Sequence, residues 1–313
     1  MAESREALGR SPVTVTHRLE YAAVRAAQAI VCALPAGLAR ELGAVLGSLA
    51  FSVVRVRRDV TLRQLEAALG PAVPRRALAR IALAAYRNFG RMTFEYARFP
   101  RLSRSEIERT VRVTGGEHLR SALAGGKGVI LVAAHFGNWE LAATLATMCY
   151  PVSFLVGEQH NTLVDGLMNR LRQGFGVETI PLTGSLRGVF RALRANRIVA
   201  MLSDQDAGRS GIFVEFFGRP ASTPYGPGRF AVATGAPLIP GVAVRHPGGR
   251  HELVIAPPVP APPEGTPSDE AARLLTQAYT AAFEGFIRDH PDHYFWMHRR
   301  WKTRPDGTRE TRP

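Results

Sequence analysis

The stretch GVILVAAHFGNWE, residues 128–140, joins a fully apolar run to a short polar segment. Its first part, 129–134, is typical of a buried β-strand, because six apolar residues follow one another without a charge. Gly137 and Asn138 then predict a turn, and Asn138 is a good N-cap for a helix that begins at Trp139. The stretch therefore predicts a strand, a turn and a helix in succession.

The same alternation continues along most of the chain. Two helices are expected first, and strands separated by helices follow them, without an internal repeat. A Pro-rich connection, 257–267, precedes one last helix with an apolar stripe. We therefore predict an α/β fold in which a mixed sheet is flanked by helices. The predicted strands are 129–134, 152–156, 198–203, 212–217, 238–244 and 252–256, and the predicted helices are 75–99, 116–124, 139–148, 163–173 and 186–195.

The composition is that of a globular and strongly basic protein. Hydrophobic residues make up 46% of the 313 residues, which is enough for a large buried core. The 40 Lys and Arg residues outnumber the 26 Asp and Glu residues and give a net charge of +14. Such a surface attracts nucleic acid, anionic lipid headgroups, coenzyme A or an acidic carrier protein. The two cysteines, Cys32 and Cys149, form no disulfide framework and no metal-binding pattern.

Residues 21–54 are rich in Ala, Leu, Val and Gly, but charged residues and a proline interrupt them. The longest uncharged runs, 26–39 and 42–54, are shorter than the roughly 18–20 residues that cross a bilayer. An embedded or interfacial helical anchor is one interpretation, and the basic stretch 55–58 suits the anionic cytoplasmic leaflet. A helical hairpin buried in the core is the alternative.

Several common catalytic motifs do not occur in the sequence. The GGKG stretch at 125–128 lacks the glycine spacing and the Ser or Thr of a phosphate-binding P-loop. Neither a GxSxG nucleophile elbow nor an HExxH zinc motif is found. The sequence therefore does not support a P-loop protein, a serine hydrolase of that type or a zinc protease.

His135 and Glu140 are the first candidates for a catalytic pair. His135 follows the apolar strand at the place where open α/β sheets put ligand-binding residues, and Glu140 lies in the first turn of the next helix. A carboxylate folded back against the imidazole would fix its tautomer and leave the other nitrogen free to take a proton. The same spacing occurs at His160 and Asp165, so spacing alone does not separate such a dyad from two residues without mutual contact.

Three longer segments point to a family. They are AAHFGNWE at 133–140, SDQDAGRSGIFVEFFGRPASTPYGPGRFAVATGAPLIPG at 203–241 and HYFWMHRRWKTRPDG at 293–307. In this order and near these separations they resemble the late lauroyl/myristoyl acyltransferases of lipid A biosynthesis, a branch of the lysophospholipid acyltransferase superfamily with an HxxxxD/E signature. The resemblance covers nearly the whole chain.

This resemblance implies a glycerolipid acyltransferase-like fold with a helical membrane-associating segment at 1–60 and a catalytic domain at 61–313. It implies transfer of a fatty acyl group from acyl carrier protein to a hydroxyl of a lipid A precursor, at the cytoplasmic face of the inner membrane. His135 would be the base, and Glu140 would orient it and stabilise its charge. Neither a metal nor an organic cofactor is needed, and nucleic acid is not an expected partner.

The resemblance also implies substrate-binding residues. Arg172 would lie near the site, where it could hold a phosphate or the developing oxyanion, although a surface position on its helix is equally consistent with the sequence. Asp204 and Gln205 follow a predicted strand and would face the site; the alternative is that they only cap the following turn. One departure is Gly157, because family members carry an Arg at this position, so the anionic contacts of the acceptor stay open.

Three other interpretations compete with this one. The protein could be an acyltransferase that acts on another glycolipid or a lysophospholipid, or a non-catalytic protein that binds membrane surfaces. A nucleic-acid binder is the third, but no basic helix with interleaved aromatic residues precedes the basic segment at the carboxyl end. A basic segment at 298–305 is either a solvated tail or a docking site for the acidic carrier protein through Arg299, Arg300, Lys302 and Arg304.

Overall fold

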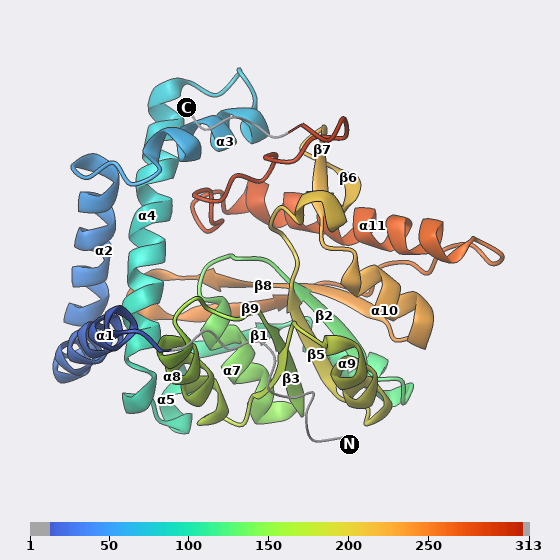
Figure 1. Ribbon diagram of the computed structural model, residues 1–313, viewed down its shortest axis with the longest axis horizontal. Coiled ribbons are helices and arrows are strands. Elements are labelled where there is room, and N and C mark those ends of the chain that lie inside the picture. Colours follow the sequence, from blue (N-terminus) through green and yellow to red (C-terminus); the bar gives the residue numbers. More distant parts are fainter. Residues whose placement is uncertain (1–12, 309–313) are drawn as a thin grey trace.

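The computed structural model describes residues 13–308 and is built around a seven-stranded sheet (Figure 1). The strand order is β1-β9-β8-β2-β5-β3-β4. All neighbours pair in parallel except β8 and β9, which are antiparallel, so the predicted mixed sheet is confirmed. Its strands are β1 (Val111–Thr114), β2 (Val129–Ala133), β3 (Val152–Val156), β4 (Glu178–Pro181), β5 (Ile198–Leu202), β8 (Leu238–Arg245) and β9 (His251–Ile255).

Helices cover both faces of the sheet. One face packs against α5 (Arg104–Thr110), α6 (Gly116–Ala124), α7 (Trp139–Cys149) and α8 (Thr162–Gln173). The other face packs against α9 (Ser185–Arg194), α10 (Gly226–Thr234) and α11 (Ser268–Asp289). The remaining α-helices are α1 (Val15–Ala33), α2 (Ala36–Ser52), α3 (Arg58–Leu69) and α4 (Arg75–Ala97), and α2 and α4 run side by side at the left of Figure 1.

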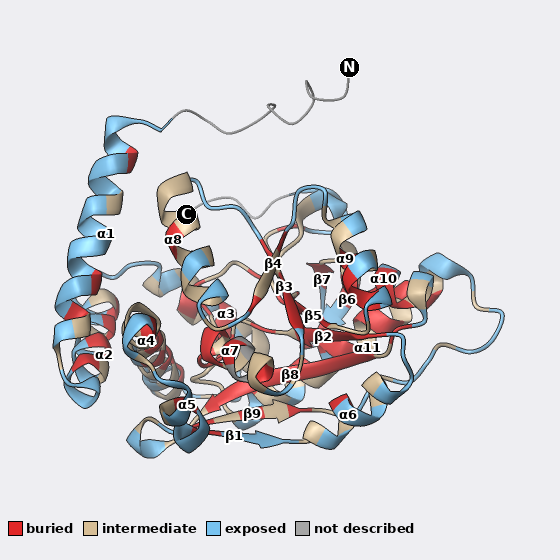
Figure 2. Ribbon diagram, turned by 90° about the horizontal axis from the view of Figure 1, so that it is seen from below, coloured by how far each residue is buried: buried red, intermediate tan, exposed pale blue. Residues whose placement is uncertain are grey.

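The apolar residues of β2 contribute to the hydrophobic cores on both faces of the sheet. Val129 and Leu131 belong to the core beneath α6 and α7, whereas Ile130 and Val132 belong to the core on the opposite face. A parallel strand covered on both faces needs apolar side chains at every position, which is why β2 shows no polar alternation. Figure 2 shows these central strands buried between exposed helix surfaces.

The strand register brings two distant polar residues together. Ala133 at the end of β2 is paired with Leu202 at the end of β5, and the two strands are parallel. His135 comes two residues after Ala133, and Asp204 comes two residues after Leu202. The two residues therefore lie side by side just beyond the ends of β2 and β5. The carboxyl ends of parallel strands form the edge at which α/β proteins bind ligands.

The structure differs from the predicted strands in two respects. The predicted strand 212–217 is β6 (Ile212–Phe216), but it pairs with β7 (Arg219–Thr223) in a separate antiparallel hairpin. The four-residue strands β1 and β4 were not predicted, because short and partly exposed strands carry no long apolar run.

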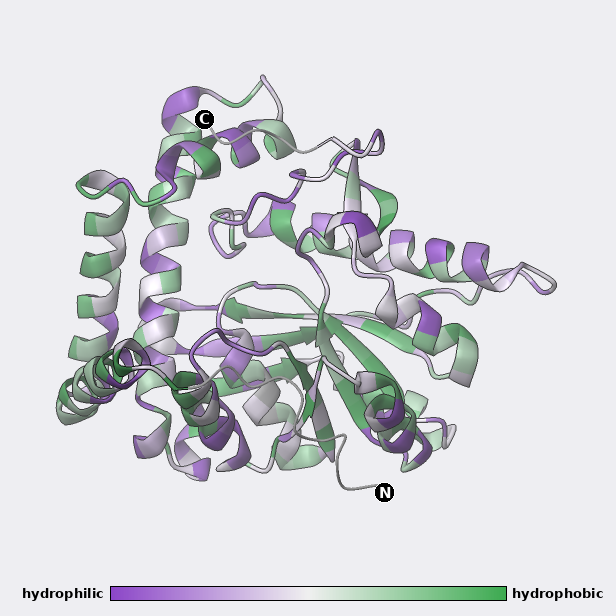
Figure 3. Cartoon of the chain, in the orientation of Figure 1, coloured by the Kyte–Doolittle hydropathy of each residue, from purple (hydrophilic) through white to green (hydrophobic). Residues whose placement is uncertain are grey.

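Residues 21–54 form two helices that break at Pro35. Within residues 13–308, no helix is both long enough and apolar enough to cross a membrane. The first twelve residues of the predicted 1–60 segment lie outside the described part of the chain. Figure 3 shows hydrophobic residues along both helices, and the largest exposed ones are Val15, Leu19, Val24, Ile30, Leu38, Leu42, Val45, Leu46 and Leu49, with Val53, Val54 and Val56 just beyond.

The second helix packs closely against α4 through glycines. A Cβ on Gly43 would clash with the carbonyl group of Gly90, and a Cβ on Gly47 would clash with the carbonyl group of Tyr86. The backbones can approach this closely only without side chains at these positions. One face of α2 is therefore packed into the fold, as the buried-hairpin alternative predicts. The other face is apolar and exposed.

The basic segment near the carboxyl end is not a solvated tail throughout. Arg300 is 2% exposed, and its guanidinium donates hydrogen bonds to the carbonyl oxygen of Ser222 and to Thr223 Oγ1. Trp301 is also buried. The expectation that Arg300 docks a carrier protein is therefore wrong, because its side chain holds the β7 hairpin to the rest of the fold.

Candidate active site

The centre of the candidate site is a buried hydrogen bond between His135 and Asp204. Nδ1 of His135 lies 2.7 Å from Oδ1 of Asp204. The Asp204 side chain is 3% exposed and the His135 side chain 22% exposed, so solvent reaches only part of the imidazole. A carboxylate can only accept here, so the hydrogen is on Nδ1 and Nε2 has its lone pair free for a proton.

Opposing effects set the protonation of this pair. Burial alone would lower the pKa of His135, but the charge and hydrogen bond of Asp204, with a smaller contribution from Glu140, raise it above its usual value. Burial alone would also raise the pKa of Asp204, yet the nearby imidazole and its hydrogen bond hold it below its usual range. The carboxylate therefore stays ionised and stabilises a positive charge on the imidazole.

Glu140 does not make the direct contact with His135 that the five-residue spacing suggested. Its carboxylate accepts two hydrogen bonds from the guanidinium of Arg172, at 2.6 and 2.9 Å. Glu140 lies in the first turn of α7 and Arg172 in the last turn of α8, so each charge also suits its helix end. Asp204 holds the imidazole instead, and Glu140 acts on it only through its electric field.

The ion pair between Glu140 and Arg172 is itself buried, with side chains 5% and 11% exposed. Arg172 also donates a hydrogen bond to Asn169 Oδ1. Because Glu140 neutralises its charge, Arg172 is not a free cation beside His135. The prediction that Arg172 lies near the site is consistent with this geometry. Its contact with a substrate phosphate or oxyanion stays a prediction.

Gln205 remains near the site, whereas His160 and Asp165 do not form a pair. Gln205 follows Asp204 at the end of β5, is half-buried, and stays a predicted substrate contact. His160 packs edge-on against His17, with ring centroids 5.3 Å apart, and Asp165 instead accepts a hydrogen bond from the backbone of Gln159. The second five-residue spacing is therefore not a catalytic pair in the structure.

Aromatic rings surround the exposed part of His135. The ring of Trp139 lies edge-on at 5.0 Å, and the ring of Phe295 lies 6.2 Å away. Phe89 contacts both of these rings, at 6.4 Å from Trp139 and 4.9 Å from Phe295. These three side chains limit water around the imidazole, and burial of this kind strengthens its interaction with Asp204.

The segment around 293–303 holds both halves of the pair. The backbone NH of Phe295 donates to the carbonyl oxygen of His135, and the hydroxyl of Tyr294 donates to the carbonyl oxygen of Asp204. His298 accepts a hydrogen bond from the backbone of Asp206, and burial lowers its pKa to about 4, so it stays neutral. The segment 293–303, part of the third stretch that carries the family resemblance, therefore positions both His135 and Asp204 through backbone and side-chain hydrogen bonds.

Glu95 is a supporting residue that the sequence analysis missed. Its carboxylate accepts a hydrogen bond from the Asn138 side chain at 2.7 Å and binds the Arg245 guanidinium at 2.5 and 2.8 Å. Asn138 in turn caps α7, because its side chain accepts from the backbone of Leu141. In the sequence, the position of this carboxylate beside the apolar stripe of helix 75–99 was the feature that could have indicated a buried role for Glu95. Glu95 thus connects α4 to the turn that carries His135.

A small apolar cavity of about 30 Å³ lies behind the strand ends, next to Ala133, Ala134 and Trp139. Among residues 13–308, no group of three His, Cys, Asp or Glu side chains is arranged to hold a metal ion. The chemistry that the described side chains offer is proton transfer at Nε2 of His135, with Asp204 as its ionic partner.

The structure thus places a strand-end His beside a buried carboxylate at the carboxyl ends of the parallel strands β2 and β5, and comparison with known proteins identifies the family of the chain. The model of the bacterial lipid A biosynthesis acyltransferase family matches residues 13–303. The lipid A biosynthesis lauroyltransferase of Escherichia coli is 30% identical over 89% of this chain and 90% of its own length. The chain belongs to this family, as its resemblance in sequence implied.

Other relatives carry a different acceptor in their names. The phosphatidylinositol mannoside acyltransferase of Mycobacterium tuberculosis is 36% identical over 50% of this chain, and the chain spans about half of that protein's length, 52%. A solved structure of the 1-acyl-sn-glycerophosphate acyltransferase from Thermotoga maritima shows 17% identity, with 80% of this chain and 98% of that chain covered. Its TM-score of 0.38 is too low to support an argument about the site.

Proposed function

We propose that the protein is an O-acyltransferase that moves a fatty acyl chain from a carrier thioester to a hydroxyl of a phosphorylated glycolipid. The observation that carries this proposal is the hydrogen bond between His135 and Asp204 at the ligand-binding edge of the sheet. It leaves Nε2 of His135 as a base in a partly dry pocket. Family membership supports the acyl group as the group transferred.

The proposed reaction needs only this one base. Nε2 of His135 takes the proton of the acceptor hydroxyl while the hydroxyl oxygen attacks the thioester carbonyl carbon. The tetrahedral intermediate then collapses, the carbon–sulfur bond breaks, and the thiolate takes the proton back from Nε2. The ester and a free thiol are the products, and no covalent enzyme intermediate forms. Asp204 stabilises the imidazolium between the two proton transfers.

Glu140 has a supporting part in this proposal. Its charge raises the pKa of His135, although its hydrogen bonds go to Arg172. The pair formed by Glu140 and Arg172 also fixes α7 against α8, next to the turn that carries the base. We therefore keep Glu140 among the site residues and assign the direct orientation of the imidazole to Asp204.

For the acceptor we propose a lipid A precursor, because a lipid A biosynthesis lauroyltransferase matches 89% of this chain and 90% of its own length. A phosphatidylinositol mannoside is the second candidate, since relatives that are 34–36% identical over about half of this chain are phosphatidylinositol mannoside acyltransferases by name. For the donor we propose acyl carrier protein. The net charge of +14 favours an acidic protein, and the charged residues left for docking in the segment are Arg299, Lys302 and Arg304.

We also propose that the protein works on the cytoplasmic face of the inner membrane, bound through α1 and α2. Support comes from the exposed apolar side chains of both helices and from the arginines that follow them. Helices of this kind lie in the interface without crossing the bilayer.

The proposed function is tested with purified protein, a lipid A precursor and acyl carrier protein loaded with a labelled acyl chain. Mass spectrometry of the lipid should show one added acyl chain in ester linkage. A parallel reaction with a phosphatidylinositol mannoside compares the second acceptor, and acyl-coenzyme A compares the donor. Absence of transfer to either acceptor from either donor would contradict the proposal.

A further inference from the structure

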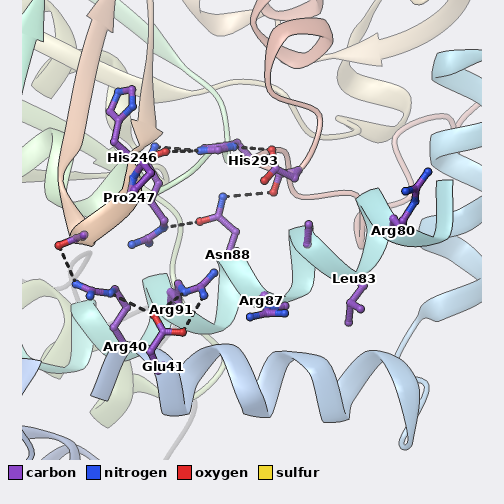
Figure 4. A pocket seen from close by; sticks show the side chains of 15 residues that line it. Arg40, Glu41, Arg80, Leu83, Arg87, Asn88, Arg91, His246, Pro247 and His293 are labelled. Carbon is purple, nitrogen blue, oxygen red and sulfur yellow. Dashed lines mark hydrogen bonds and ion pairs between the residues drawn. The ribbon is translucent and has the colours of Figure 1, made fainter. Parts of the chain in front are cut away.

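A basic pocket lies between α2, α4 and the turn that joins β8 to β9, outside the site of the His135 pair. Its volume is about 480 Å³, within the size range of small-ligand sites. Five arginines line it, namely Arg40 from α2, Arg80, Arg87 and Arg91 from α4, and Arg245 from β8 (Figure 4). The lining carboxylates are Glu41 and Asp292.

Two of these arginines have charges that the protein does not neutralise. Glu41 is shared between Arg91, at 2.9 Å, and Arg40, at 3.6 Å, while Glu95 binds Arg245. Within residues 13–308, the structure gives Arg80 and Arg87 neither an acidic partner nor a hydrogen bond. Asp292 does not compensate for them, because its carboxylate binds the imidazole of His293 at 2.9 Å.

The arginines of α4 are arranged along one side of the helix. Positions 80, 87 and 91 are separated by seven and four residues, so their side chains lie within about 40° of one another around the axis. The row is roughly 16 Å long, given the rise of an α-helix. This exceeds the size of a single inorganic phosphate and suits an extended headgroup that bears phosphate.

The pocket shares a wall with the surroundings of His135. His293 lines the pocket, and its carbonyl oxygen accepts a hydrogen bond from the backbone of Gly137, two residues after His135. Asn88 lines the pocket as well, and the next residue, Phe89, packs against both aromatic rings beside the imidazole. The wall of the pocket is therefore connected by these contacts to the turn that carries His135 and to the aromatic rings beside it.

The rest of α2 fits an occupant that is a lipid. Arg40 and Glu41 face the pocket, whereas Leu42, Val45 and Leu49 of the same helix are exposed apolar residues. One helix thus offers charge to a headgroup and an apolar face to acyl chains or the bilayer. A free sugar phosphate would use only the first of these surfaces.

We propose that this pocket binds the phosphate-bearing headgroup of the acceptor lipid and thereby positions its hydroxyl for His135. This inference rests on the proposed function, because it takes the acceptor to be a phosphorylated glycolipid. Arg80 and Arg87 contribute the charge that phosphate recognises, and Arg91 and Arg40 extend the row.

The test measures binding without any acyl donor. Wild type and the Arg80→Gln/Arg87→Gln variant are titrated with a phosphorylated lipid A precursor in neutral detergent micelles. The variant should bind about tenfold more weakly, since two exposed but charge-assisted contacts are lost. The matched control is Arg75→Gln/Arg76→Gln, which removes two exposed arginines of the same helix that do not line the pocket. It should bind like wild type.

Two further arms identify the source of the phosphate. Phosphatase-treated precursor should bind wild type as weakly as the intact precursor binds the variant, and millimolar inorganic phosphate should compete only poorly. If inorganic phosphate displaces the precursor at its own dissociation constant, the site binds free phosphate and the proposal is wrong. If the variant loses binding to anionic phospholipid vesicles without precursor by the same factor, the occupant is a bilayer lipid and the proposal is equally wrong.

The binding assay also separates this inference from the proposed reaction. Wild type that binds the precursor through these arginines but transfers no acyl chain would support the pocket and overturn the reaction. Acyl transfer with an unchanged KM for the precursor in Arg80→Gln/Arg87→Gln would support the reaction and overturn the pocket. Equal melting temperatures of the variants and wild type exclude unfolding as the cause.

Discussion

Asp204 contacts His135 because the strands that precede these two residues, β5 and β2, pair in parallel and in register. The parallel pairing of β2 with β5 joins residues that are 69 positions apart, and the same offset separates the two members of the pair. Each of these two residues was recognisable in the sequence by its place after an apolar run. The sequence could not show that they meet, since strand order is a property of the whole sheet. The nearer carboxylate, Glu140, was therefore the apparent partner.

The pH dependence of transfer follows from this pair. Only unprotonated His135 can act as a base, so activity should fall as the pH drops through its raised pKa, which lies above 6.5. Asp204→Asn removes the carboxylate that raises this pKa, so the midpoint of the pH profile should move to lower pH. The maximal kcat should fall by roughly 10²–10⁴-fold, because the imidazolium loses its ionic partner.

Asp165→Asn is the control for that profile, because the Asp165 carboxylate accepts hydrogen bonds from the backbone of Gln159 and from the Asn169 side chain and does not contact the imidazole of His135. Its midpoint should match wild type. A profile of Asp204→Asn that keeps its midpoint would show that Asp204 does not control His135.

At the scale of elements, the apolar pattern located the buried strands and the helices that cover them. β2, β3, β5, β8 and β9 all lie within one or two residues of their predicted positions. The strand 212–217 was predicted, but its pairing with β7 in a separate hairpin was not, since an apolar run does not reveal which sheet a strand joins. The segment 293–303 has little regular structure, and only the fold shows that it braces the site.

Glu95 connects α4 to β8 and β9 through Arg245 and His251, and its titration makes that connection measurable. Burial would raise the pKa of Glu95, but His251 at 3.6 Å and the Arg245 guanidinium lower it to about 2. A lowered pKa contributes stability that is present above the ordinary value of 4.5 and is lost as the pH falls towards 2. The shift corresponds to about 3 kcal/mol at neutral pH.

Glu95→Gln should therefore lower the free energy of unfolding at pH 7 by about 3 kcal/mol. The difference from wild type should shrink as the pH is lowered below 4.5, where wild-type Glu95 begins to lose its advantage. Urea unfolding followed by circular dichroism at several pH values measures both effects. Glu41→Gln, which removes a mostly exposed carboxylate of an ion pair, should change stability by less than about 1 kcal/mol. A constant difference between Glu95→Gln and wild type across this range would refute the assignment.

At the scale of the whole molecule, α1 and α2 give one end of the protein an apolar surface. Deleting residues 1–54 would also remove the face of α2 that packs on α4, so loss of binding and loss of folding would be confused. Val45→Glu/Leu49→Glu changes two exposed residues and leaves the glycine contacts intact. We expect this variant to fold normally and to sediment with phospholipid vesicles several-fold less than wild type.

The matched control for membrane binding is Leu182→Glu/Leu186→Glu, two exposed leucines on the far side of the sheet near α9. It should sediment with vesicles as wild type does. Equal sedimentation of all three proteins would show that α2 does not bind the bilayer. The charge balance and the apolar content suggested an anchor from the sequence, but only the fold shows which face of each helix is available.

The central claim is that His135 is the base for acyl transfer. The most direct measurement is the single-turnover rate of acyl transfer from labelled acyl carrier protein to the precursor by His135→Ala, with His160→Ala as the control histidine. We predict a rate for His135→Ala that is roughly 10²–10⁴-fold below wild type, with an unchanged melting temperature, and a wild-type rate for His160→Ala. A folded His135→Ala protein that transfers the acyl chain at a near-normal rate would contradict the account.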